Sequence, residues 1–249
     1  MSIRDRVSPQ EWEARINLAA CYRLVDYYGM SDMTGTHITV RVPGTHDQFL
    51  INDSNLFFEE CTASSLIKID IEGNVLDGSN GLVNKAGYVI HSAIHEARHD
   101  VECVLHTHTV PGMAVSALEC GLLPLFQHSF DFYLKTSYHD YEGVAVNEDE
   151  KQRLVADLGE NNFALVLRNH GLLTCGRNVA EAFSLMYRMN KACEAQLYAL
   201  SARGKIHEVA PEIRVETSRY MKDRKTQVHD RSWAGHLRRL DRIDPSYKH

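Results

Sequence analysis

The sequence lacks most of the features that would assign a chain to a structural class at once. Its 249 residues include only six prolines and no Pro-, Ser- or Gly-rich linker, so we expect one domain over residues 1–249. No stretch approaches the roughly eighteen apolar residues of a membrane span, and the first residues, MSIRDRVSPQEW, lack the apolar core of a secretory signal. We therefore expect a cytoplasmic protein with no membrane partner.

Other absences exclude further classes. The six cysteines have no C-x-x-C spacing, which argues against a zinc knuckle or a cysteine nucleophile and predicts buried free thiols. Neither a P-loop nor a Gly-x-Gly-x-x-Gly fingerprint occurs. The net charge of −6 argues against nucleic acid as a partner, so a small molecule is the expected ligand.

Helical signals occur along the whole chain. Ser8 is predicted to cap the first helix, with Pro9 at its first position, Glu11 completing a capping box and Gly29 ending it. Asn178 predicts the start of another helix that runs to about residue 202 and is expected to be the longest. Apolar spacing predicts further helices at 88–98, 111–118 and 148–158. We expect the charged tail, 211–249, to form helices anchored by Tyr220, Trp233, His236 and Leu240.

Short apolar or alternating runs predict the strands. Residues 38–42 and 48–51 form one expected antiparallel hairpin, 66–70 and 74–76 a second, and 163–167 with 172–175 a third. Single strands are expected at 101–105 and 122–126. Loops beside these strands hold His37, Ser54 and Asn55, which either line a pocket or satisfy their own backbone.

Three histidines stand at strand ends. His106 and His108 follow the apolar run at 101–105, and their spacing of two places both side chains on one face. His170 follows the strand at 163–167. A His-x-His pair is often only a pair of hydrogen-bonded side chains, but three neutral imidazoles with an open position suit a catalytic Zn²⁺. The same ligands suit Mn²⁺, Co²⁺ or Fe²⁺.

Several longer motifs together resemble a known family. GYVIHSAIH, AVSALECGLLPL and RNHGLLTCG, with HTHT between the first two, are similar in order to segments of the class II aldolase/adducin family. The resemblance covers about residues 12–204. It implies a three-layer α/β/α fold around a mostly antiparallel sheet, and a homotetramer with active sites between subunits. It also implies that His106, His108 and His170 bind a divalent metal, usually zinc.

The chain departs from the sugar-phosphate aldolases of that family at its substrate residues. Those enzymes carry an acid/base carboxylate in the turn before the helix that here contains His91, whereas residues 83–87 read VNKAG. Two phosphate-binding serines of that turn are replaced near Lys85 and Ala86, and an Asn before the first strand is replaced by His37. In these segments the sequence is more similar to the adducin head and its short bacterial relatives than to the sugar aldolases.

Our leading hypothesis is a metal-dependent carbon–carbon lyase, either an aldolase or a decarboxylase of a small hydroxylated acid. A His₃-bound cation stabilises the anion left when that bond breaks. Lys85 is the candidate to orient a substrate carboxylate, and His37 the candidate proton donor. Ser54, Asn55 and Asn84 are the candidate substrate contacts by family position.

Other readings stay open. Lys85 is equally interpreted as a solvated loop lysine, and His37 as a turn residue. A noncatalytic adducin-like module for self-association is the alternative function. An iron-dependent oxygenase that uses the same three histidines is a third.

Overall fold

The computed structural model describes residues 2–143 and 148–249, apart from the side chains of 85–87, 148 and 222–227. In that part of the chain, seven strands form one sheet in the order β3-β2-β1-β4-β7-β6-β5. Every neighbouring pair is antiparallel except β5 and β6. The strands are β1 (Ile38–Arg41), β2 (Gln48–Ile51), β3 (Ile67–Asp70), β4 (Cys103–Thr107), β5 (Thr136–His139), β6 (Ala164–Leu167) and β7 (Gly171–Gly176).

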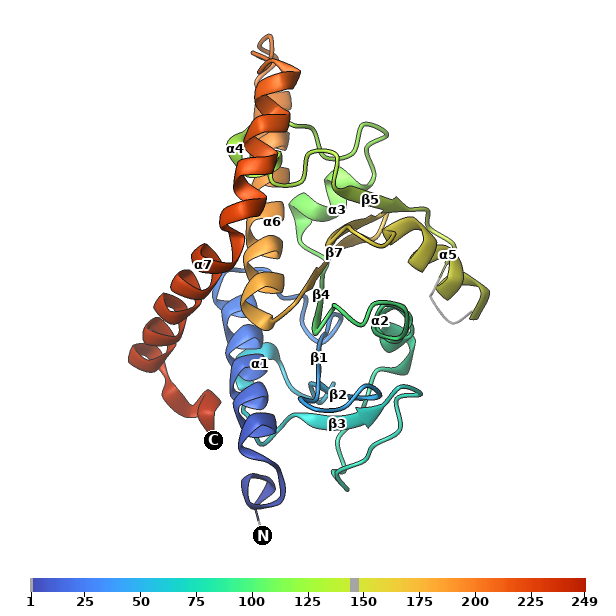
Figure 1. Cartoon of the computed structure of the whole chain (residues 1–249), viewed down its shortest axis with the longest axis vertical. Coiled ribbons are helices and arrows are strands. Elements are labelled where there is room, and N and C mark those ends of the chain that lie inside the picture. The colour runs from blue at the N-terminus through green and yellow to red at the C-terminus, as the bar shows by residue number, and fades with distance from the viewer. Residues whose placement is uncertain (1, 144–147) are drawn as a thin grey trace.

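Helices cover both faces of this sheet. Side chains of α1 and α6 pack on one face and those of α2 and α5 on the other, which gives three layers (Figure 1). The fold is therefore the mostly antiparallel α/β/α sandwich that the family resemblance implied. The α-helices are α1 (Pro9–Tyr27), α2 (Lys85–Ala97), α3 (Val110–Ser116), α4 (Gln127–Phe130), α5 (Glu148–Leu158), α6 (Val179–Ser201) and α7 (Pro211–Ile243).

Three 3₁₀ segments complete the regular structure of the described residues. They are η1 (Ile3–Arg6), η2 (Phe58–Glu60) and η3 (Pro245–Lys248). The buried Tyr247 of η3 accepts a hydrogen bond from the backbone N–H of Ala63, so the end of the chain is held against the residues before β3. No helix among the described residues is both long enough and apolar enough to cross a bilayer.

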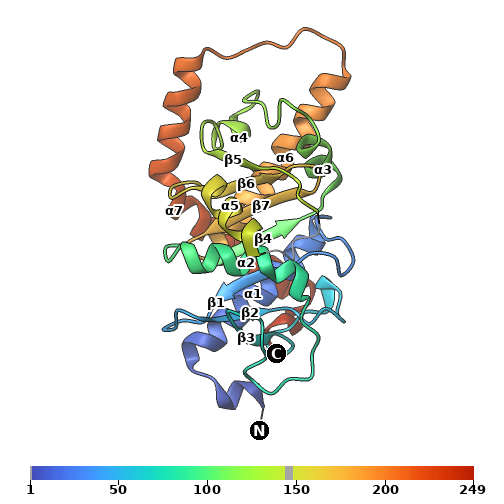
Figure 2. The same ribbon diagram turned by 90° about the vertical axis from the view of Figure 1, so that its right-hand side faces the viewer.

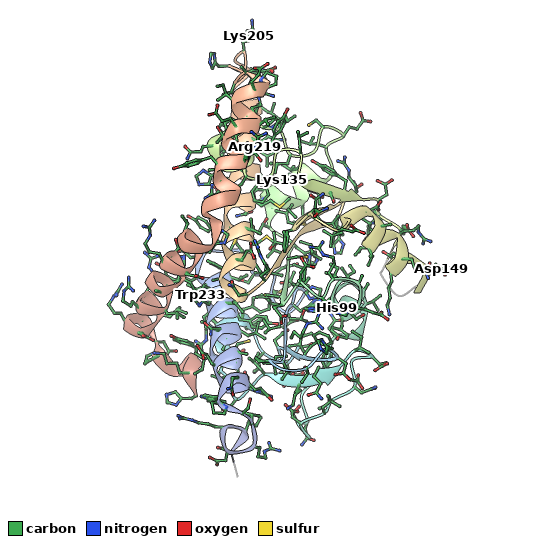
Figure 3. The ribbon with its side chains drawn as sticks, in the orientation of Figure 1. His99, Lys135, Asp149, Lys205, Arg219 and Trp233 are labelled. Atoms are coloured by element: carbon green, nitrogen blue, oxygen red, sulfur yellow. The ribbon has the colours of Figure 1, made fainter. Side chains whose placement is uncertain are left out.

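The α7 helix is the longest element. It has 33 residues against the 23 of α6, so the expectation that α6 would be longest is wrong. The connection between α6 and α7 lies at the end of the molecule opposite both termini (Figure 2). Trp233, which Figure 3 labels, and Leu240 are buried as predicted, whereas Tyr220 is 58% exposed.

Other predicted elements also need correction. Residues 122–126 form no strand, because Pro124 has no amide hydrogen and the N–H groups of Leu122 and Leu123 donate to side chains instead. The following strand, β5, was not predicted. Residues 74–76 contribute only an isolated bridge between Val75 and Ile69.

The first helix has the predicted Ser8 cap, but the capping box predicted for Glu11 does not form. The Ser8 hydroxyl accepts from the backbone N–H of Glu11, and Gly29 ends the helix with φ +64°. The carboxylate of Glu11 binds Arg15 and Lys68 rather than completing a capping box.

The cysteines largely match the prediction of buried free thiols. Five of the six free cysteines are buried, and Cys120 is exposed.

Candidate metal centre

The three strand-end histidines meet at one point. His108 Nε2 lies 2.8 Å from His106 Nε2 and 2.9 Å from His170 Nε2. One nitrogen from each ring falls within 4.8 Å of the other two, and the three ring centroids are 4.6–4.9 Å apart. The structure therefore brings together three residues that span sixty-four positions of the sequence.

The backbone around these histidines explains their convergence. His106 lies in β4, and His108 follows it just before Thr109, whose hydroxyl caps α3 by accepting from Gly112 N–H. Asn169, in the left-handed region at φ +55°, turns the chain between β6 and β7 and presents His170. Gly171 is required because a Cβ there would collide with the backbone oxygen of Thr107.

The outer ring nitrogens of two of the histidines are occupied. His106 Nδ1 lies 2.9 Å from the Leu172 carbonyl oxygen, and His108 Nδ1 lies 2.9 Å from Asp32 Oδ2. Since an oxygen without a proton can only accept, each Nδ1 carries the hydrogen and each Nε2 lone pair faces the shared point. Tetrahedral ligands at Zn–N distances of 2.0–2.1 Å stand about 3.3 Å apart, so small ring movements would admit a cation. The donor set fits a divalent metal.

The protonation state of His106 and His170 also suits metal binding. Burial, followed by the nearby His170 and His108, lowers the pKa of His106 well below its usual range. Burial and the nearby His108 lower the pKa of His170 to about 4. Both rings are therefore neutral at physiological pH, which is the form that binds metals.

A second group of histidines lies beside this centre. His37 is 4% exposed, and its ring is 4.1 Å from that of His91 in α2 and 6.3 Å from that of His106. The Thr39 hydroxyl lies 2.8 Å from both His91 Nδ1 and His95 Nε2. Because a hydroxyl has one hydrogen, it donates to one ring and accepts from the other, which couples the two tautomers.

The predicted substrate residues lie in two adjoining loops. Ser54 N–H donates to the Leu82 carbonyl at 2.8 Å, which holds the loop after β2 against the segment before α2. Asn55 is exposed and bonds Asp53, while the Asn84 carbonyl accepts from Tyr88 N–H. Among the described residues, neither Ser54 nor Asn55 hydrogen-bonds to any of the three histidines. Lys85 opens α2, and its side chain lies outside the described residues.

Sequence reasoning missed three residues around the centre. Asp32 precedes no recognisable motif and lies 76 positions before its partner His108. His91 and His95 had one available signal, their i, i+4 spacing on a predicted helix. Their shared partner Thr39 lies far away in the sequence, in strand β1.

Comparison with known proteins places this geometry in a family. The family model described as class II aldolase and adducin N-terminal domain matches residues 16–197. A Pseudomonas aeruginosa protein, whose name assigns it to aldolase class 2 without stating a reaction, is 48% identical over 99% of this chain and 96% of its own length. This chain belongs to the class II aldolase/adducin family.

The matched proteins include both a named aldolase and an adducin. The L-fuculose 1-phosphate aldolase of Glaciozyma antarctica is 28% identical with a TM-score of 0.83, covering 95% of this chain and 92% of that structure. Rat alpha-adducin is 44% identical over 76% of this chain, which spans only 26% of the adducin. The resemblance stated from motifs alone is confirmed, while the individual reaction depends on the site.

Proposed function

We propose that this protein is a metal-dependent carbon–carbon lyase acting on a small hydroxylated acid or carbonyl compound. The observation that carries the proposal is the convergence of the His106, His108 and His170 nitrogens within 4.8 Å of one another. When bound there, a divalent cation, best Zn²⁺ and otherwise Mn²⁺, Co²⁺ or Fe²⁺, would act as a Lewis acid toward a chelating hydroxy-carbonyl group.

The protein's own residues would position the substrate around that cation. Buried His37, next to His106, is the proposed proton donor. Its neighbour His91 is neutral because burial lowers its pKa, so His91 adds no positive charge beside the cation. Lys85 would orient a substrate carboxylate from the first turn of α2. Ser54, Asn55 and Asn84, from the adjoining loops before α2, would bind the remaining polar groups.

The residues around the start of α2 favour decarboxylation over aldol cleavage. Residues 83–87 contain no carboxylate to remove a hydroxyl proton, as aldol cleavage requires. Decarboxylation needs no such step, because the electron pair of the breaking bond remains on the substrate as carbon dioxide leaves, and a proton then replaces the lost group. Aldol cleavage with another base is the alternative within the same proposal.

Metal content and turnover test the proposal together. Protein purified without chelators should hold about one equivalent of divalent metal per chain, measured by elemental analysis. A panel of hydroxylated aliphatic and aromatic acids should then reveal carbon dioxide or aldehyde release that a chelator abolishes and added Zn²⁺ restores. Metal-loaded protein that cleaves no member of the panel would contradict the lyase proposal.

The 44% identity to alpha-adducin supports one alternative, a noncatalytic self-association module. Such a module has no need of a cation. Less than about a tenth of an equivalent of metal per chain, with no binding of added Zn²⁺, would favour it over the lyase. Oxygen consumption with phenolic acids after Fe²⁺ loading would instead indicate an oxygenase.

We also propose a cytoplasmic homo-oligomer, best a tetramer, of single-domain subunits. Four exposed apolar side chains lie near site residues in the chain or in space. Met33 follows Asp32, Val110 and Met113 lie in α3 just after His108, and the ring of Tyr141 is 6.4 Å from that of His170. Apolar patches of this kind commonly mark association surfaces. Light scattering should give about four times the 28.3 kDa chain mass, and a monomer at micromolar concentration would contradict the assembly.

A further inference from the structure

We propose that Asp32 is a positioning residue of the metal centre, an inference that rests on the proposed function. Its carboxylate oxygen Oδ2 accepts the Nδ1–H of His108 at 2.9 Å. This bond holds the imidazole in the tautomer whose Nε2 lone pair faces His106 and His170. The negative charge also makes the ring a stronger donor to a cation.

His108 needs such a partner more than His106 does. His106 lies within β4, and its Nδ1 is held by a carbonyl oxygen of the neighbouring strand β7. His108 lies beyond the end of β4, and its Nδ1 hydrogen-bonds the Asp32 carboxylate instead of a strand carbonyl. The loop between α1 and β1 supplies the missing acceptor from a side chain.

The backbone of that loop is arranged around the carboxylate. Gly35 N–H donates to the Asp32 carbonyl at 2.7 Å and closes a four-residue turn. Met33, the second residue of the turn, is in the left-handed region at φ +45°, which is uncommon for a bulky side chain. It is 73% exposed, so packing of Met33 within the subunit does not explain the strain. Strained positions of this kind cluster at functional sites.

Gly35 leaves space for the carboxylate. A Cβ at Gly35 would lie 3.2 Å from Asp32 Oδ2 and 3.1 Å from the Asp32 carbonyl oxygen. The Asp32 side chain keeps 45% of its surface in water, so its contact with His108 adds little to folding. Metal affinity and fold stability can therefore be measured as separate properties of Asp32 variants.

The test is Zn²⁺ affinity, measured by competition with a chromogenic chelator, for the D32A, D32N and D47A variants. We expect D32A to weaken Zn²⁺ binding about 10- to 100-fold and D32N less, since Asn retains one acceptor oxygen without the charge. Asp47, an exposed carboxylate in the turn between β1 and β2, is the matched control and should leave affinity unchanged. The urea midpoint of the metal-free D32A protein should match that of the wild type.

A second variant tests the same idea with Asp32 intact. G35A should crowd Oδ2, lower Zn²⁺ affinity and alter the visible absorption spectrum of the Co²⁺-loaded protein. Wild-type affinity in both D32A and G35A would overturn the positioning role while leaving the metal centre in place. If D32A fails to fold, D32N and G35A decide. If the wild-type protein binds no Zn²⁺, both the positioning role and the proposed function fail.

Discussion

His106, His108 and His170 are held by three different kinds of neighbour. His106 is fixed by a strand carbonyl and is buried, whereas His108 depends on a loop carboxylate. His170 follows a left-handed asparagine and remains partly exposed. Removing His170 should therefore disturb metal binding with the least damage to the core.

We predict that H170A lowers Zn²⁺ affinity by more than about 100-fold, because a lost ligand costs more than a lost outer partner. Unfolding stability of the metal-free protein should change by less than about 1 kcal/mol. Chelator competition measures the first quantity and urea denaturation the second. His99, exposed beyond α2, is the control (Figure 3), and H99A should bind Zn²⁺ like the wild type. Unchanged affinity in H170A would remove this residue from the ligand set.

At the scale of elements, helix α2 holds two buried histidines, His91 and His95, against the sheet. Burial, followed by the nearby Arg41, lowers the pKa of His95 to about 3. Burial, followed by the neighbouring His37, lowers the pKa of His91 well below its usual range. In the unfolded chain both rings take up a proton near their ordinary pKa of 6.5. The unfolded state therefore binds more protons over the interval between these values.

This difference predicts loss of stability on acidification. As pH falls from about 6.5 towards 3, each such histidine should lower the free energy of unfolding by up to about 1.4 kcal/mol per pH unit. Urea midpoints of metal-free protein across that interval measure the slope. H95Q should flatten the slope, whereas H99Q should not. An H95Q profile parallel to that of the wild type would show that His95 does not contribute.

A buried cation ties α1 to the segment after β3. Arg15 is fully buried and pairs with Glu11 and Asp77, both almost fully buried, and also donates to the Leu66 carbonyl oxygen at 2.7 Å. Lys68 forms a second ion pair with Glu11. Among the described side chains, Arg15 is the one cation that pairs with Asp77.

We predict that R15M costs about 3–5 kcal/mol of unfolding free energy, since it leaves the Asp77 carboxylate buried without a cation. The matched control is K191M, which removes a half-exposed pair with Glu194 and should cost less than about 1 kcal/mol. Urea denaturation compares the two. Equal effects would mean that the buried network contributes no more than a surface pair.

The elements that sequence reasoning missed have a physical reason in common. Residues 122–126, LLPLF, have the composition of a strand, but Pro124 and the side-chain acceptors Tyr138 and Gln196 prevent strand pairing. β5 reads TSYH, without an apolar run, and forms because β6 offers it a parallel edge. Pairing between strands is not encoded in either segment alone.

At the scale of the whole molecule, the C-terminal helix is part of the core although the family model ends at residue 197. Trp233 packs against Phe183 of α6, and its ring N–H donates to Asn17 of α1 at 2.7 Å. One side chain thus joins three helices from opposite ends of the chain.

We expect W233A to lower the free energy of unfolding by about 3–5 kcal/mol, through the cavity and the lost hydrogen bond. Y220A, on the exposed surface of the same helix, should change it by less than about 0.5 kcal/mol in the monomer. Thermal and urea unfolding measure both. A small effect of W233A would mean that α7 docks only weakly on the rest of the chain.

Local patterns in the sequence were sufficient for most strands and the helix caps, because periodicity and capping depend on residues a few positions apart. The three layers were implied by the family resemblance. Local patterns also located His106, His108 and His170 at strand ends. Only the tertiary structure joined Asp32 to His108, Thr39 to His91 and His95, and Trp233 to Asn17. These contacts span loops whose closure no local pattern specifies, so they exist only once the sheet and its helices have packed.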